Sequence, residues 1–180
     1  MKQLKTTEKQ SRFKVKEGLI MKYIKYLTLV VLIFQLAFAL SYKDLFPYLV
    51  ELKGWKGEKP TGSKISATFG KMITAERSYV KDSKRIHISI IKGGMAVSMF
   101  APFSMITEID TPEEYVKVFK IGSFKAGLSH RKKENSGQII VLLTGDSVFS
   151  MEYTDMEYKE ALKLLKEFPL KDIARKTSGL

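Results

Sequence analysis

Two histidines, His87 and His130, are the side chains best suited to metal binding or proton transfer in this chain. A metal site needs several ligands in spaced clusters, and no partner stands at such a spacing from either residue. His87 alternates with apolar residues and is expected on the wet face of a strand, and His130 lies beside a polar turn. We therefore expect two surface histidines, no metal site and no cofactor.

Catalysis by a serine hydroxyl needs a base and an orienting acid around the nucleophile. The segment GDSVF (residues 145–149) has the pattern of a hairpin turn rather than of an elbow that displays a nucleophile. Asp110, Glu113 and Glu114 could act as paired carboxylates, but a helix start accounts for all three. No catalytic residue is predicted, and the protein is not expected to be an enzyme. A hydrolase of unknown type stays an alternative, which a deep polar pocket gathering His87 or His130 with a carboxylate and a serine would support.

The segment GEKPTGSK (residues 57–64) nearly spells a phosphate-binding loop. In that motif the lysine precedes the hydroxyl residue, so that the lysine reaches the phosphates and the hydroxyl reaches magnesium. Here the order is reversed and no buried strand comes before it. A lysine-rich turn is predicted instead.

A soft, apolar segment at residues 93–110, GGMAVSMFAPFSMITEID, is the remaining candidate. It is apolar nearly all round and contains Pro102, which favours a short buried helix with a kink or a stop. Core packing accounts for most of its side chains. The alternatives are a methionine-rich, adaptable surface for an apolar ligand or partner and thioether binding of copper(I).

The same segment has too many apolar residues for one helical stripe, so we expect its side chains to divide between two roles. The residues predicted to pack on the sheet are Ala96, Val97 and Phe100. The residues predicted for the rim of an apolar groove are Met95, Met99 or Phe103.

An uncharged run over residues 26–42 decides where the protein works. It is at the short end for a membrane span, which usually holds about 20 apolar residues. Basic residues precede it, its apolar centre is short, and it contains the small-residue pattern Ala37-Phe38-Ala39; these are the parts of a secretory signal peptide. We predict a signal peptide over residues 21–39 with cleavage after Ala39, and a membrane anchor over residues 26–42 as the alternative.

Residues 1–20 are predicted to be a mis-called upstream extension, with Met21 as the true start. If Met1 is the start, these residues form a cytoplasmic tail whose basic charge favours the anchor. In both cases residues 40–180 are expected outside the cytoplasm, in the periplasm or secreted, as a single α+β domain.

Composition limits the classes of function. The chain has no cysteine, so neither a disulfide nor a lipid-anchoring cysteine is expected. Its net charge of +12 includes a strongly basic N-terminal segment, and its other lysines are scattered among glutamates. Without a basic helix or an aromatic RNA-binding motif, nucleic-acid binding is not expected, whereas weak contact with an anionic membrane surface is. The bias to Lys and Glu with a single asparagine is typical of thermophile proteins.

The elements that must position these residues are mostly strands. Residues 71–92 form two strand-like runs around a polar KDSK turn, and the alternation of Ile86, Ile88 and Ile90 with polar residues predicts a hairpin. Residues 115–153 have the pattern of a meander of further strands. Residues 40–64 are predicted to be a short helical or irregular piece followed by a loop, and residues 110–114 to form at most one helical turn.

The C-terminal part carries a helix signal. Thr154 and Glu157 have the spacing of a capping box, and an apolar stripe follows that predicts an amphipathic helix ended by Pro169. Arg77 shares a strand face with apolar residues and is expected to hold a partner group or to guard a sheet edge. The predicted fold class is α+β: an antiparallel sheet with the C-terminal amphipathic helix and the short apolar helix packed on one side of it.

Several short motifs carry a resemblance to known proteins: GW at residues 54–55, AERSY at 75–79, IGSFKA at 121–126 and FPLKDIA at 168–174. Together with the apolar helix after a hairpin, they resemble a group of small uncharacterised exported bacterial proteins. The order of hairpin, helix, meander and C-terminal helix also looks like the PsbP-like α/β sandwich of extrinsic photosystem proteins and some bacterial lipoproteins. This resemblance implies a binding or accessory domain rather than an enzyme, and it carries over no catalytic residue.

These observations favour an exported, non-enzymatic accessory or binding domain. Its expected partner is an unidentified apolar ligand or protein at the Met/Phe-rich groove. The alternatives are a signal-anchored membrane protein with the same external domain and an extracytoplasmic hydrolase.

Overall fold

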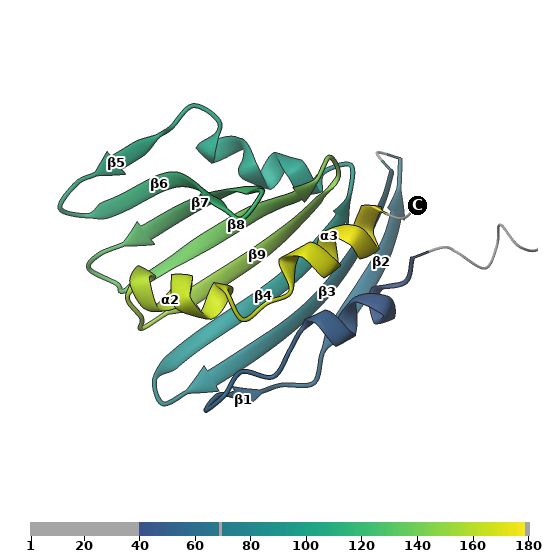
Figure 1. Ribbon diagram of the computed structural model, residues 1–180, viewed down its shortest axis with the longest axis horizontal. Coiled ribbons are helices and arrows are strands. Elements are labelled where there is room, and N and C mark those ends of the chain that lie inside the picture. Colours follow the sequence, from purple (N-terminus) through teal and green to yellow (C-terminus); the bar gives the residue numbers. More distant parts are fainter. Residues whose placement is uncertain (1–39, 69, 179–180) are drawn as a thin grey trace, which may run out of the picture. The chain divides into compact units, whose positions relative to one another are not determined.

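The computed structural model of the protein describes residues 40–68 and 70–178, which contain one antiparallel sheet of nine strands (Figure 1). The strand order is β1-β3-β4-β9-β8-β7-β6-β5, and β2 pairs with a different part of β3 from β1. The strands are β1 (Lys56–Gly57), β2 (Thr61–Ala67), β3 (Gly70–Lys81), β4 (Lys84–Gly93), β5 (Glu108–Asp110), β6 (Glu114–Ile121), β7 (Phe124–Arg131), β8 (Ser136–Thr144) and β9 (Ser147–Thr154). The predicted α+β class and antiparallel sheet are confirmed.

One half of the sheet is built on the hairpin β3–β4. Its strands are joined by Asp82 and Ser83, and Asp82 adopts a φ of 55°, as tight hairpin turns often require. The inward side chains of Ile86, Ile88 and Ile90 are all buried, which confirms the hairpin that their alternation predicts.

The segment before β3 is more ordered than its composition predicts. Ser41 and Asp44 form a capping box at the start of η1, a 3-10 helix over Tyr42–Tyr48. The loop expected after it contains β1 and β2, so that prediction is wrong. Its residues carry no strand signal of their own, but the outer edge of the 12-residue β3 offers backbone groups that pair with them.

Residues 110–114 do not form a helical turn. They connect β5 to β6, and Thr111 Oγ1 accepts a hydrogen bond of 3.0 Å from the backbone N–H of Glu114. Because β6 pairs with both β5 and β7, its backbone groups are already bonded and are not available to a helix.

The C-terminal helix starts later than predicted and is followed by a second one. α2 covers Tyr158–Leu165 and has no side-chain cap, because Thr154 is the last residue of β9 and pairs with Arg85 of β4. The predicted capping box is therefore wrong. Pro169 precedes α3 (Leu170–Ser178), at a helix start where its missing N–H costs little. α2, α3 and η1 lie on the same face of the sheet (Figure 1).

The short apolar helix packs on the opposite face. It is η2, a 3-10 helix over Ala96–Phe103. Ile139 and Val141 of β8 belong to the core under α2 and α3, whereas Ile140 and Leu142 pack with η2. Since successive strand side chains point to opposite faces, helices cover both sides of the sheet rather than the one side predicted.

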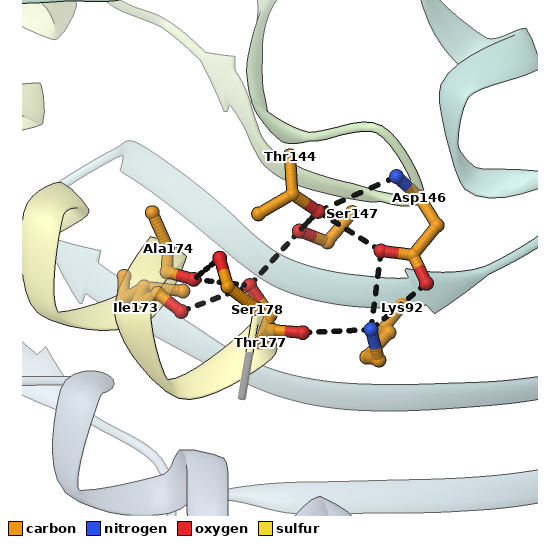
Figure 2. A network of polar contacts seen from close by, with 8 residues as sticks. All are labelled: Lys92, Thr144, Asp146, Ser147, Ile173, Ala174, Thr177 and Ser178. Carbon is orange, nitrogen blue, oxygen red and sulfur yellow. Dashed lines mark hydrogen bonds and ion pairs between the residues drawn. The ribbon is translucent and has the colours of Figure 1, made fainter. Parts of the chain in front are cut away.

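The last turn of α3 is bonded to the sheet by a polar network (Figure 2). Lys92 Nζ donates to the carbonyl oxygen of Thr177 at 2.7 Å and to the Asp146 carboxylate at 2.8 Å. Ser147 Oγ lies 2.9 Å from Thr177 Oγ1 and 2.6 Å from Thr144 Oγ1. A cation at the C-terminal end of a helix is favoured by the helix dipole, so this network fixes the position of α3 and of the chain that joins it to α2.

Candidate functional sites

The Met/Phe segment divides between core and surface, but not as predicted. Phe103 is only 4% exposed, and a Cβ placed on Gly127 would come within 2.3 Å of its ring. Phe103 is therefore a core residue packed on β7 rather than a rim residue, because Gly127 leaves the room its ring needs. Ala96 and Phe100 are buried as predicted, and Val97 is half-buried.

The methionines of this segment lie toward the surface. Met95 is 52% and Met105 is 98% exposed, whereas Met99 is half-buried against the core under η2. None of the three lines any of the pockets described below. The predicted groove at Met95 and Met99 stays a prediction.

The residues predicted to mark signal cleavage, Ala37 and Ala39, lie outside the described residues. So do the predicted tail over residues 1–20 and the signal peptide over residues 21–39. Within residues 40–68 and 70–178, the helices are too short or too polar to cross a membrane.

Arg77 is buried and holds the segment before β3 in place. Its guanidinium donates to the carbonyl oxygens of Leu49 at 2.7 Å and Glu58 at 2.8 Å, and it forms an ion pair with Glu51. A Cβ on Gly57 would come within 2.5 Å of it. The inward charge predicted here therefore has protein partners and serves to hold the edge of the sheet.

His130 is buried, so its predicted surface position is wrong. Its Nδ1 lies 3.1 Å from Tyr153 Oη, its ring contacts Tyr158, and Nε2 is 4.0 Å from the Glu157 carboxylate. Burial lowers the pKa of His130, and the Glu157 charge only partly opposes this effect. The sequence contained a signal for this burial, because His130 continues the alternation of the inward residues Ala126 and Leu128. The polar residues that follow His130 made its position look like part of a surface turn.

His87 lies where the alternation predicts, on the polar face of β4. Its Nδ1 is 3.1 Å from Ser78 Oγ on β3, and its register partner on β9 is Glu152. Gln138 on β8 donates to Glu152 at 3.3 Å. These residues form a row across four neighbouring strands, on the sheet face opposite α2 and α3.

Two half-open pockets lie along this polar row. One has a volume of about 240 Å³ and includes Ser78, His87 and Glu152 in its lining. The other, of about 280 Å³, shares Glu152 and adds Arg131 and Gln138. A histidine, a carboxylate and a serine are thus brought together at one surface, but in a half-open pocket rather than in the deep polar pocket that the hydrolase alternative requires.

A third pocket has a different character. It lies between the β6–β7 turn and the connection from α2 to α3, with a volume of about 380 Å³. Leu165, Phe168 and Leu170 line it and are at most 7% exposed, so they form a packed floor. Ile121 and Phe124 are half-buried and form a wall on the strand side.

Two turns shape this apolar pocket. Gly122, with a φ of 59°, makes the tight turn between β6 and β7, a conformation that favours glycine. Pro169 separates α2 from α3 and lines the pocket itself. Lys166, Lys171 and Asp172 complete the lining at the rim.

The three acids considered as paired carboxylates do not share a site. Asp110 forms an ion pair with Lys132, and Glu113 lies 3.7 Å from Lys133. Glu114 accepts a hydrogen bond of 2.8 Å from Ser129. In the part of the chain that the structure describes, no group of three His, Asp or Glu side chains is placed to hold a metal ion.

No family model, no curated protein and no solved structure matches this chain. The resemblance to small exported bacterial proteins and to the PsbP-like sandwich therefore stays a prediction. The chemistry of the apolar pocket and of the polar row is the remaining guide to function.

Proposed function

We propose that the folded part of this protein is an extracytoplasmic binding domain, and that the pocket between the β6–β7 turn and the α2–α3 connection holds a small ligand with an apolar part. One observation carries the proposal: a pocket of about 380 Å³ whose floor is already formed by buried core side chains. Protein pockets that bind small molecules usually measure about 300–1,000 Å³ and are mostly apolar.

The lining favours binding over catalysis. Its members are Ile121, Gly122, Phe124, Leu165, Lys166, Phe168, Pro169, Leu170, Lys171 and Asp172. It therefore includes neither a histidine nor a hydroxyl or thiol nucleophile. Its buried floor belongs to the same core as α2 and α3, so a ligand meets a preformed surface and little conformational entropy is lost on binding. Placement outside the cytoplasm follows from the signal-peptide pattern.

The pocket can be tested by filling it. Ile121→Trp places a larger ring at its half-buried wall, whereas Met105→Trp makes a matched change at a side chain that is 98% exposed. We expect the neutral fluorescent probe N-phenylnaphthylamine to bind the wild-type protein and Met105→Trp equally, and Ile121→Trp at least about tenfold more weakly. Thermal midpoints of all three proteins verify that they are folded. If folded Ile121→Trp bound the probe as tightly as the wild type does, the probe would bind at a site other than this pocket.

A second candidate function is a hydrolase on the polar row. The observation that favours it is the hydrogen bond of 3.1 Å between Ser78 Oγ and His87 Nδ1, with Glu152 opposite His87 in the register. A histidine in this position can take the proton of a serine hydroxyl that attacks an acyl group, and a carboxylate can stabilise the resulting imidazolium.

Covalent labelling separates the two candidates. A fluorophosphonate should label Ser78 if His87 activates it, and Ser78→Ala should abolish the label while the exposed Ser66→Ala retains it. Absence of labelling in the wild-type protein would exclude the hydrolase candidate, so that binding remains as the proposed function.

A further inference from the structure

The charges around the apolar pocket are not balanced. Its lining holds three charged side chains: Lys166 and Lys171, which are exposed, and Asp172, which is half-buried. Asp172 forms an ion pair with Arg175, one turn further along α3. Neither lysine forms an ion pair with another residue in the described part of the chain. Two exposed lysines thus stand among the lining residues of an apolar pocket, and the one carboxylate among these residues is already paired.

The two lysines are held on opposite sides of the α2–α3 connection. Lys166 follows the last residue of α2, and Lys171 lies in the first turn of α3. Leu165 and Leu170, each next to one of these lysines in sequence, have their side chains buried in the core below. α3 is bonded to the sheet at its far end by Lys92 and Ser147 (Figure 2), and its first residue, Leu170, is buried, so both ends of the helix that carries Lys171 are anchored.

We propose that the ligand of this pocket is an amphiphilic anion, namely a single alkyl chain that ends in a carboxylate. The alkyl chain lies between Phe124 and Leu165, and the carboxylate lies at the rim between the ammonium groups of Lys166 and Lys171. This inference rests on the proposed function, since it names the class of ligand for the same pocket. The apolar floor provides the affinity, and the two cations select the charged head over a neutral one.

The experiment compares decanoate with decanol, which has the same chain and a neutral head, by calorimetry on the purified protein at concentrations where both probes are monomeric. We expect decanoate to bind at least about tenfold more tightly than decanol. Added salt should weaken the binding of decanoate but not of decanol, because salt screens exposed charges. Shortening the carboxylate chain should reduce affinity about fourfold for each methylene group removed.

A double variant tests the rim directly. Lys166→Gln with Lys171→Gln should reduce decanoate binding to the level of decanol and leave decanol binding unchanged. The matched control is Lys163→Gln with Lys176→Gln, which removes one exposed lysine from each of the same helices outside the pocket lining. This control should bind both probes as the wild type does.

The possible results separate this inference from the proposed function. Equal affinities for decanoate and decanol, both lost in Ile121→Trp, would overturn the anion preference while supporting an apolar pocket. Failure of both probes to bind would overturn both proposals. Binding of anionic phospholipid vesicles through the two lysines, without binding of monomeric decanoate, would overturn the inference and assign the lysines to a membrane surface.

Discussion

The ammonium group of Lys92 on β4 donates a hydrogen bond of 2.7 Å to the carbonyl oxygen of Thr177, in the last turn of α3. The same group contacts both carboxylate oxygens of Asp146, at 2.8 and 3.1 Å. One side chain thus connects the hairpin before η2, the β8–β9 turn and the C-terminal helix. Its removal would leave an acceptor and an acid without their cation.

Lys92→Met should therefore destabilise the fold. Hydrogen bonds to charged groups contribute about 1.5–3 kcal/mol, and the Lys92 side chain is only 14% exposed, so we expect a loss of about 1–3 kcal/mol. Lys176→Met, at an exposed position of α3, should change stability by less than about 0.5 kcal/mol. Urea denaturation measures both. Equal midpoints for the two variants would show that the network does not hold α3.

Asp146 predicts an acid dependence of stability. Burial opposes its ionisation, but hydrogen bonds from Lys92 and Thr144 outweigh burial and hold the pKa of Asp146 below its usual value. A carboxyl with a lowered pKa in the folded state contributes stability above the pKa of the unfolded chain, and this stability is lost as the pH falls toward the folded pKa.

Asp146→Asn should accordingly be less stable than the wild type at neutral pH and should lose less stability on acidification. The measurement is the denaturation midpoint of both proteins at a series of pH values, from neutral pH down to the acid range in which carboxylates become protonated. The same slope in both proteins would show that Asp146 has an ordinary pKa in the folded state.

His130 predicts a second pH dependence, at higher pH. Burial lowers the pKa of His130 below the usual histidine value of 6.5, so the unfolded chain binds a proton more readily than the folded protein does. Stability should therefore be full above the unfolded pKa and fall as the pH drops below about 6.5. Thermal midpoints between pH 8 and pH 5, a range around that pKa, should decline for the wild type.

A substitution of His130 itself tests this effect. His130→Phe retains an aromatic ring but loses the hydrogen bond to Tyr153, so this variant should be less stable at neutral pH. Its thermal midpoint should change little over the same pH range. A flat wild-type profile would contradict a buried, neutral His130.

Phe103 and Gly127 predict a packing effect. Phe103→Ala should cost about 3–5 kcal/mol, because a large buried ring is removed and leaves a cavity, whereas Met105→Ala at a 98% exposed site should cost less than about 0.5 kcal/mol. Gly127→Ala should cost about 1–3 kcal/mol, because its Cβ would meet the Phe103 ring at 2.3 Å. Denaturant midpoints measure all three. If Phe103→Ala lowered the free energy of unfolding as little as Met105→Ala does, Phe103 would not be a core residue.

Local pattern was sufficient for the elements whose partners are near in sequence. The β3–β4 hairpin was predicted because Ile86, Ile88 and Ile90 alternate with polar residues and a polar KDSK turn lies between the two runs. The meander from β6 to β9 was predicted on the same basis. In these elements backbone pairing and side-chain alternation agree, so a single stretch of sequence contains both signals.

Tertiary structure decided the rest, because the deciding groups are far apart in sequence. Residues 56–57 and 61–67 form strands only because the edge of β3 pairs with them. Thr154 belongs to β9 rather than to the helix, because it pairs with Arg85 of β4. The apolar pocket joins the β6–β7 turn to the α2–α3 connection, more than 40 residues apart. Neither the turn nor the connection contains a recognisable sequence motif. The pocket forms only where the packing of distant segments leaves a space between them, and the sequence of one segment does not predict such a space.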